Sequence, residues 1–228
     1  KETLKNFYKG KIFLPRAFSA ENHLEEISGI YVPFWLYSCE SNGSFSFDAT
    51  RTHHYTDGDY DVTETEHYLV LRDGEARFNN IPVDGSSKMD DAYMDAIEPF
   101  DYSAITDFHT DYLPGYAAQT YDEDATACAP RATARVKNTT IAAIRRTCDY
   151  TTLTPRTSKI STTQNSVDYA LLPVWMLTTN WHGKSYHFAI NGQTGKLIGD
   201  LPIDKGRFFS LLAGITIPLG ILLKLFIF

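Results

Sequence analysis

Leu171-Leu-Pro-Val-Trp-Met-Leu177 is the stretch that decides the fold, together with Tyr186-His-Phe-Ala-Ile-Asn-Gly-Gln-Thr-Gly-Lys-Leu-Ile-Gly199 and Leu201-Pro-Ile-Asp204. The first run is wholly apolar, the second alternates apolar and polar residues, and the third is short. Glycine-containing segments at 182–184 and 191–195 separate the runs, and glycine supplies the positive φ angles that tight turns need. The pattern predicts a meander of three strands.

A degenerate copy of this pattern stands in the first half of the chain. Tyr31-Val-Pro-Phe-Trp-Leu-Tyr37 aligns Pro33 and Trp35 with Pro173 and Trp175. The repeat predicts an α+β fold with two related antiparallel β-meander units, a helical connector between them and a C-terminal transmembrane helix. The other matched residues are Phe45, Phe47 and Ala49 with Tyr186, Phe188 and Ile190, and Ile81-Pro-Val-Asp84 with Leu201-Pro-Ile-Asp204.

Five parts of the chain follow from this organisation: an N-terminal helical segment (1–29), a first β unit (30–85), a helical connector (86–166), a second β unit (167–204) and a transmembrane helix (208–228). Helices are predicted from residue 1 to 8, 19 to 28, 88 to 97 and 122 to 148. The last has Cys128, Ala132, Val136, Ile144 and Cys148 on a buried stripe and Pro130 inside it. An excursion at 51–61, a turn at Asp73-Gly74 and a loop at 151–166 complete the expectation.

Composition excludes some classes of function. The formal net charge of −7 over 228 residues argues against a protein that binds nucleic acid by neutralising phosphates. Cys39, Cys128 and Cys148 are an odd number with no CxxC pair, so neither a disulfide framework nor a cysteine zinc site is expected in this chain, which fits a reducing compartment.

The C-terminal tail is strongly apolar. Phe208–Phe228 carries Lys224 as its only charge, and at about 1.5 Å per residue it makes a helix of about 31 Å, close to a hydrocarbon core of about 30 Å. It is predicted to span a membrane, the alternatives being a buried hairpin or an amphipathic strip. Lys205 and Arg207 flank it on the near side and favour a cytoplasmic globular part, while Lys224 can snorkel to the far interface.

The connector is divided by charge. Residues 84–124 hold eleven acidic side chains and one lysine, whereas residues 131–146 hold five basic side chains and no acid. One interpretation is two solvated faces that attract each other or face water. The other is a docking face for anionic lipid or an acidic partner. The basic residues are Arg131, Arg135, Lys137, Arg145 and Arg146.

Signals for catalysis are weak. His53 and His54 lie near Asp57, Asp59 and Asp61 and form the one cluster with metal-ligand chemistry, but neighbouring side chains on a loop seldom converge on an ion. Glu64 and Glu66 share a strand face, which is more typical of an exposed polar surface than of paired catalytic carboxylates. Trp35 and Trp175 have the chemistry to stack a ligand, yet their place in apolar strands indicates a core role.

Several motifs together resemble a known family. They are Phe13-Leu-Pro-Arg-Ala-Phe18, Gly29-Ile-Tyr-Val-Pro-Phe-Trp-Leu36, Tyr112-Leu-Pro-Gly-Tyr116, Leu172-Pro-Val-Trp175, and Ala189-Ile-Asn-Gly-Gln-Thr-Gly-Lys196 through Gly199-Asp-Leu-Pro202. Over 1–207 the chain looks like the C-terminal region of bacterial TFIIB-type zinc-ribbon-containing membrane proteins, which are often labelled primosomal helicase PriA or replication-restart proteins. Their zinc ribbons have no counterpart here, so no residue of this chain is expected to bind zinc and no other cofactor is expected.

The resemblance implies a membrane-attached cytoplasmic adaptor, since some relatives belong to envelope-stress systems that recruit phage-shock protein A and flotillin-like proteins. We therefore expect a non-enzymatic adaptor on the bacterial cytoplasmic membrane, with lipid and protein partners. The alternative is a nucleic-acid accessory protein acting through residues 131–146. A third hypothesis is a hydrolase that uses His53, His54 and nearby acids.

Overall fold

The structure is a computed structural model that describes residues 2–20 and 26–227. In chain order the elements are α1 (Glu2–Tyr8), α2 (Arg16–Ala20), β1 (Glu26–Asp57), β2 (Tyr60–Asp84), α3 (Asp91–Ala96), the 3₁₀ turns η1 (Tyr102–Ala104) and η2 (Thr110–Tyr112), β3 (Tyr116–Ala118), α4 (Ala125–Arg146), β4 (Thr152–Trp181), β5 (Lys184–Asn191), β6 (Leu197–Gly199) and α5 (Lys205–Ile227).

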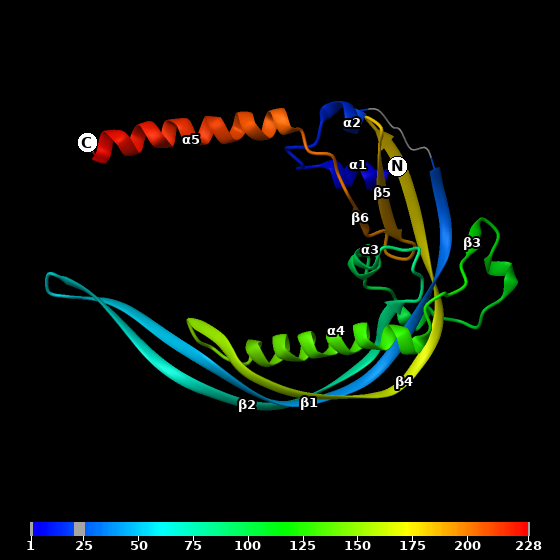
Figure 1. The fold of residues 1–228 in the computed structure, drawn as a ribbon, viewed down its shortest axis with the longest axis horizontal. Coiled ribbons are helices and arrows are strands. Elements are labelled where there is room, and N and C mark those ends of the chain that lie inside the picture. The colour runs from blue at the N-terminus through cyan, green and yellow to red at the C-terminus, as the bar shows by residue number, and fades with distance from the viewer. Residues whose placement is uncertain (1, 21–25, 228) are drawn as a thin grey trace. The chain divides into compact units, whose positions relative to one another are not determined.

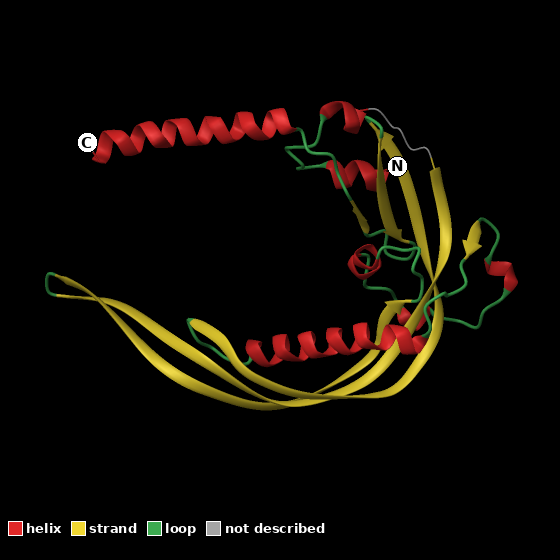
Figure 2. Cartoon of the chain, viewed as in Figure 1, coloured by secondary structure: helices red, strands yellow, loops and turns green. Residues whose placement is uncertain are grey.

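The protein is a mixed α/β fold with a largely antiparallel sheet (Figure 2). The hydrogen-bonded order is β2-β1-β4-β5-β6, and β3 pairs in parallel with β1. The chain forms two compact units: unit 1 holds the described residues of 1–31, 90–118 and 172–228, and unit 2 holds 32–89 and 119–171. Strands β1 and β4 contribute to both units, which are described one at a time.

Unit 2 is built on the hairpin of β1 and β2, whose strands curve around α4 (Figure 1). The two strands pair without a register shift from Cys39↔Phe78 to Asp57↔Tyr60, and the chain reverses at Gly58, where φ is +58°. The side chains that face α4 form the core of the unit. They are Tyr37, Cys39, Phe45, Phe47, Ala49, Val70 and Val83 from the strands, with Cys128, Ala132 and Val136 from the helix.

Helix α4 confirms the predicted buried stripe. Cys128, Ala132 and Val136 are buried, and Ile144 and Cys148 are half-buried against the strands. The helix begins at Ala125, three residues later than expected, because Asp124 is its N-cap and accepts a hydrogen bond from the Ala127 amide at 2.8 Å. Pro130 lies inside the helix, as predicted.

Two glycines allow close packing in unit 2, Gly74 against α4 and Gly43 against β4. Gly43 and Gly74 are paired across β1 and β2. A Cβ on Gly74 would lie 2.4 Å from Ile144 Cδ1, and a Cβ on Gly43 would lie 2.6 Å from the Lys159 carbonyl oxygen on β4. The predicted turn at Asp73-Gly74 is therefore wrong, because Gly74 provides space for Ile144 and the strand continues to Asp84.

Unit 1 contains an antiparallel meander of β4, β5 and β6. The end of β4 pairs with β5 from Val174↔Asn191 to Trp181↔Lys184, with a turn at His182-Gly183 where both φ angles are positive. Helix α1 packs on these strands, and Gly10, with φ +79°, follows it. The buried core side chains are Leu4, Leu14, Phe18, Leu177, Tyr186, Phe188 and Leu197.

Four further expectations need correction. Residues 51–57 and 60–61 belong to β1 and β2, and residues 152–166 belong to β4, so neither segment is a loop. The return strand of the meander is Leu197–Gly199, whereas residues 201–204 lie outside strands. The predicted helix from 19 to 28 is wrong at its end because β1 starts at Glu26, and residues 21–25 lie outside the described part.

Candidate functional site

Helix α5 is the most distinctive surface of the protein. It has 23 residues from Lys205 to Ile227, and its stretch to Lys224 is long and apolar enough to cross a membrane while none of it is buried. Its large apolar side chains stay 41% to 61% exposed. One continuous, exposed helix excludes a buried hairpin for the described residues of this stretch. The exposed apolar side chains are those of Phe208, Phe209, Leu211, Leu212, Ile215, Ile217, Leu219, Ile221, Leu222 and Leu223.

The base of α5 is fixed to unit 1 by Asp204. Its carboxylate accepts a hydrogen bond from the Arg207 amide at 3.0 Å and forms an ion pair with the Arg207 guanidinium at 3.4 Å. The Asp204 amide in turn donates to the Phe13 carbonyl at 2.7 Å. Arg207 also donates to the Leu14 carbonyl at 3.2 Å, and the rings of Phe13 and Phe208 pack edge to face with centroids 5.5 Å apart.

The three predicted flanking cations differ in their surroundings. Arg207 is half-buried and held by the contacts just described, whereas Lys205 and Lys224 are exposed at opposite ends of the apolar stretch. A bilayer-spanning helix commonly carries cations near its ends, where their charged heads reach the interfaces. The arrangement is compatible with a membrane helix.

The five basic residues of α4 do not form one surface. The Arg131 guanidinium lies 3.1 Å from Asp84 Oδ1, and Asp84 is fully buried. Arg135 donates to the Pro82 carbonyl, so both arginines bind β2. Lys137, Arg145 and Arg146 are exposed, and Arg145 donates to the Leu153 carbonyl at 3.2 Å.

Two buried polar residues, Asp84 and Asn191, are the last residues of β2 and β5. The Gly85 amide of unit 2 donates to the Pro33 carbonyl at 2.9 Å, and the Gly192 amide of unit 1 donates to the Pro173 carbonyl at 2.8 Å. The residue before each glycine, Asp84 or Asn191, is 0% exposed. The local geometry therefore matches Asp84 with Asn191, whereas the sequence pattern had matched it with Asp204.

The pKa values of the Cys128 thiol and the Asp122 carboxyl group are shifted in opposite directions. Burial raises the pKa of the Cys128 thiol to about 11, and its sulfur lies 3.6 Å from the Asp84 carbonyl oxygen. The amide and hydroxyl of Ser87 donate to the Asp122 carboxylate at 2.8 and 2.7 Å, and these hydrogen bonds lower the pKa of Asp122. Asp122 thereby joins the segment after β2 to the segment before α4.

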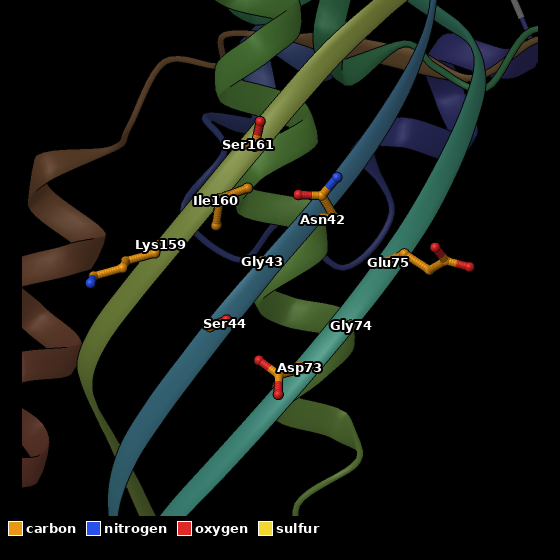
Figure 3. Close-up of a pocket in the computed structure, with 9 residues that line it drawn as sticks. All are labelled: Asn42, Gly43, Ser44, Asp73, Gly74, Glu75, Lys159, Ile160 and Ser161. Carbon is orange, nitrogen blue, oxygen red and sulfur yellow. The ribbon is translucent and has the colours of Figure 1, made fainter.

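An open hollow of about 780 Å³ lies over the glycine pair of β1 and β2 (Figure 3). Its charged side chains do not converge, because Lys159 and Glu75 point away on opposite sides in Figure 3. The arrangement offers no defined position for a ligand. Its lining residues are Asn42, Gly43, Ser44, Asp73, Gly74, Glu75, Lys159, Ile160 and Ser161.

The candidate catalytic residues lie on the exposed hairpin. His53 Nε2 is 3.9 Å from a Glu66 carboxylate oxygen, and His54 Nδ1 is 2.9 Å from the Thr63 hydroxyl. Within residues 2–20 and 26–227, no group of three or more His, Cys, Asp or Glu side chains is arranged to hold a metal ion. The histidines pair across the hairpin with residues other than Asp57, Asp59 and Asp61.

Trp35 and Trp175, for which the sequence indicated a core role over ligand stacking, each contact aromatic neighbours of their own unit. The Trp35 ring centroid lies 5.1 Å from those of Tyr121 and Tyr169, and its indole N–H donates to the Glu123 carbonyl at 2.9 Å. Trp175 packs 5.0 Å from Tyr116. Each tryptophan is thus part of the packing.

Comparison with known proteins identifies one similar sequence. No family model matches the chain. No solved structure matches it. The chain is 36% identical over 225 residues to the uncharacterized protein YdjG of Bacillus subtilis (strain 168). The match covers 98% of this chain and 66% of the relative.

Proposed function

We propose that the chain is a non-enzymatic adaptor that α5 tethers to the bacterial cytoplasmic membrane, with the globular units in the cytoplasm. The observation that carries the proposal is the unburied apolar surface of α5. An exposed apolar surface of this length is unfavourable in water. In a bilayer, each Leu, Ile or Phe at the helix centre contributes about −0.3 to −0.6 kcal/mol to insertion.

The orientation follows from the flanking charges. Lys205 and Arg207 lie at the end of α5 that leaves unit 1, and Lys and Arg near a span are retained on the cytoplasmic side. Family resemblance supplies the partner classes, phage-shock protein A and flotillin-like proteins. The exposed basic residues Lys137, Arg145 and Arg146 offer an acidic partner or anionic lipid a contact that needs no rearrangement of the core.

Membrane fractionation tests the tether. The full chain should stay in carbonate-washed membranes, and a chain ending at Arg207 should move to the soluble fraction. Ile215→Arg with Ile217→Arg should also release it, because each arginine near the centre costs about 2.5–3.5 kcal/mol. Ile215→Leu with Ile217→Leu is the matched control and should remain bound. Retention of the truncated chain in washed membranes would contradict the proposal.

Co-purification from solubilised membranes tests the adaptor role. We expect phage-shock protein A or a flotillin-like protein to be recovered with the full chain. Lys137→Glu with Arg145→Glu and Arg146→Glu should reduce that recovery, whereas Asn138→Asp and Thr139→Glu on the same helix serve as a milder charge control. Salt-dependent DNA binding that the triple variant abolishes would favour the nucleic-acid alternative instead.

A further inference from the structure

Strand β2 has a long unpartnered edge. It pairs with β1 on one side and is the outermost strand of the described sheet. From Tyr60 to Ile81 every residue is exposed or half-exposed except Val70. An open strand edge presents unpaired backbone N–H and C=O groups to any extended segment that meets it.

Proline, lysine and a bulge, three of the usual protections against pairing, are missing along this edge. Residues 60–81 contain no proline and no lysine, and the pairing with β1 has no register shift between Tyr60 and Phe78. Leu69 and Leu71 are 56% and 65% exposed on the face opposite buried Val70. Such an edge is well suited to pair with another strand.

The charges of β2 identify the partner, because they are complementary to those of the same strand running in the opposite direction. Leu69 is the midpoint of the uninterrupted run from Tyr60 to Phe78. Antiparallel pairing of two copies about Leu69 places Glu66 of each copy opposite Arg72 of the other. It also places Asp61 opposite Arg77, and no two like charges are opposed over the whole run.

The neighbouring registers lose this match. Moving the centre to Val70 places Glu66 opposite Gly74 and Asp61 opposite Asn79. Moving it to Tyr68 keeps one opposite-charge pair, Glu64 with Arg72, but opposes Asp61 to Glu75. Directly opposed like charges are destabilising, and opposite charges contribute roughly 0.2–1 kcal/mol per pair. The register centred on Leu69 is therefore favoured.

We propose that two copies of this chain associate by antiparallel pairing of their β2 strands over Tyr60–Phe78, centred on Leu69. The pairing satisfies the free edges of both copies and joins their sheets. It brings the exposed Leu69 and Leu71 side chains of the two copies together on one face, where they are withdrawn from water. Arg77 already forms an ion pair with Glu40 of its own chain at 3.2 Å, so Asp61 of the second copy extends that pair into a network.

Cysteine cross-linking tests the centre of the pairing in the full chain, reconstituted in lipid nanodiscs with Cys148→Ser. Mild oxidation of Leu69→Cys should give a covalent dimer, because the two introduced thiols lie opposite each other. Thr63→Cys is the control: in this register its copies are about 40 Å apart, at roughly 3.4 Å per residue, and should not cross-link. Absence of the Leu69→Cys dimer, or equal cross-linking of Thr63→Cys, would overturn the proposal.

Charge exchange tests the register by sedimentation in detergent. Glu66→Arg or Arg72→Glu alone should raise the dimer dissociation constant by about tenfold, and the double exchange should restore it to within about twofold. Within one chain Glu66 faces Arg51 and Arg72 faces Phe45, so only pairing between copies couples the two sites. Glu64→Arg, opposite Gly74 in the dimer, is the matched control. Failure of the double exchange to restore association would refute this register.

Discussion

The strand end at Asp84-Gly85 and the strand end at Asn191-Gly192 have the same backbone contact but different side-chain chemistry. In both, the glycine amide binds a proline carbonyl of the neighbouring strand and a fully buried polar side chain precedes the glycine. Asp84 pairs with Arg131 on α4. The Asn191 amide group donates to the Ile97 and Pro99 carbonyls at 3.0 Å, and its oxygen accepts from the Gln193 and Thr194 amides.

The difference shows how each unit attaches its helical segment. A buried carboxylate needs an opposite charge, so unit 2 holds α4 by an ion pair that also keeps Arg131 against the sheet. A buried amide is satisfied by backbone groups alone, so unit 1 holds the segment after α3 with neutral hydrogen bonds. We therefore expect the strand end at Asp84 to depend on its basic partner Arg131, and the strand end at Asn191 to need no charged partner.

Removing the two buried side chains should have the largest effect. Asp84→Ala leaves the Arg131 guanidinium, which is 27% exposed, without its buried carboxylate partner, and should destabilise unit 2 by about 3 kcal/mol. Asn191→Ala leaves two carbonyls without this donor and should cost unit 1 about 2 kcal/mol. Hydrogen exchange of the full chain in detergent should show faster exchange in α4 for the first variant and in β5 for the second.

Glu75→Ala, an exposed acid on β2, serves as the control for charge removal and should change exchange by less than about 0.5 kcal/mol. If Asp84→Ala or Asn191→Ala accelerated hydrogen exchange equally in α4 and in β5, the two strand ends would not be independent.

Adding a methyl group at the two glycines should have a smaller effect that differs between the units. A Cβ on Gly192 would lie 2.8 Å from both the Pro173 carbonyl oxygen and its Cβ, and a Cβ on Gly85 would lie 2.9 Å from the Trp35 indole nitrogen and 3.0 Å from the Glu123 carbonyl oxygen. Because the contacts at Gly192 are shorter than those at Gly85, Gly192→Ala should cost about 1–2 kcal/mol and Gly85→Ala about 1 kcal/mol. Urea titration with hydrogen-exchange readout measures both.

Gly214→Ala is the matched control, since nothing lies within 4 Å of the added carbon. The comparison would fail if Gly85→Ala were the more damaging substitution.

The smallest expected effect is a local change in thiol reactivity. Thiol labelling reports on unit 2 alone, since all three cysteines lie there. With its pKa raised to about 11, the Cys128 thiol is about 0.1% ionised at pH 8, and its labelling should rise with pH towards 11. Half-buried Cys148 should react first with iodoacetamide, as peptide mass spectrometry would show. Asp84→Ala should accelerate Cys128 labelling and Asn191→Ala should not. Native Cys128 reacting as fast as Cys148 would contradict its burial.

Local signals in the sequence predicted part of this structure. The turn at 182–183, the stop of α1 before Gly10, the stripe on α4 and the apolar helix α5 depend on nearby residues, and they are confirmed. Asp73-Gly74 carries an equally strong local turn signal but lies within β2. Its glycine is used for contact with Ile144, seventy residues later, which no local pattern reveals.

The polar segment at 152–166 shows a similar limit. Its serine and threonine content is typical of a loop, yet the structure places it in β4, where Thr157 and Thr152 hydrogen-bond to Ser46 and Thr50 of β1. For the candidate sites, composition located the basic residues of α4, but only tertiary contacts show that Arg131 and Arg135 face β2. Asp84 and Asn191 went unrecognised because a polar residue before glycine ordinarily indicates an exposed turn.

The junction at Asp204 has a mechanical consequence. Because Asp204, Arg207 and Phe208 all contact the segment at 13–14, no slack chain separates α5 from unit 1. In a membrane-bound chain, a tilt of α5 would turn unit 1 with it. Unit 1 would then follow the tilt and the lateral diffusion of α5 in the bilayer.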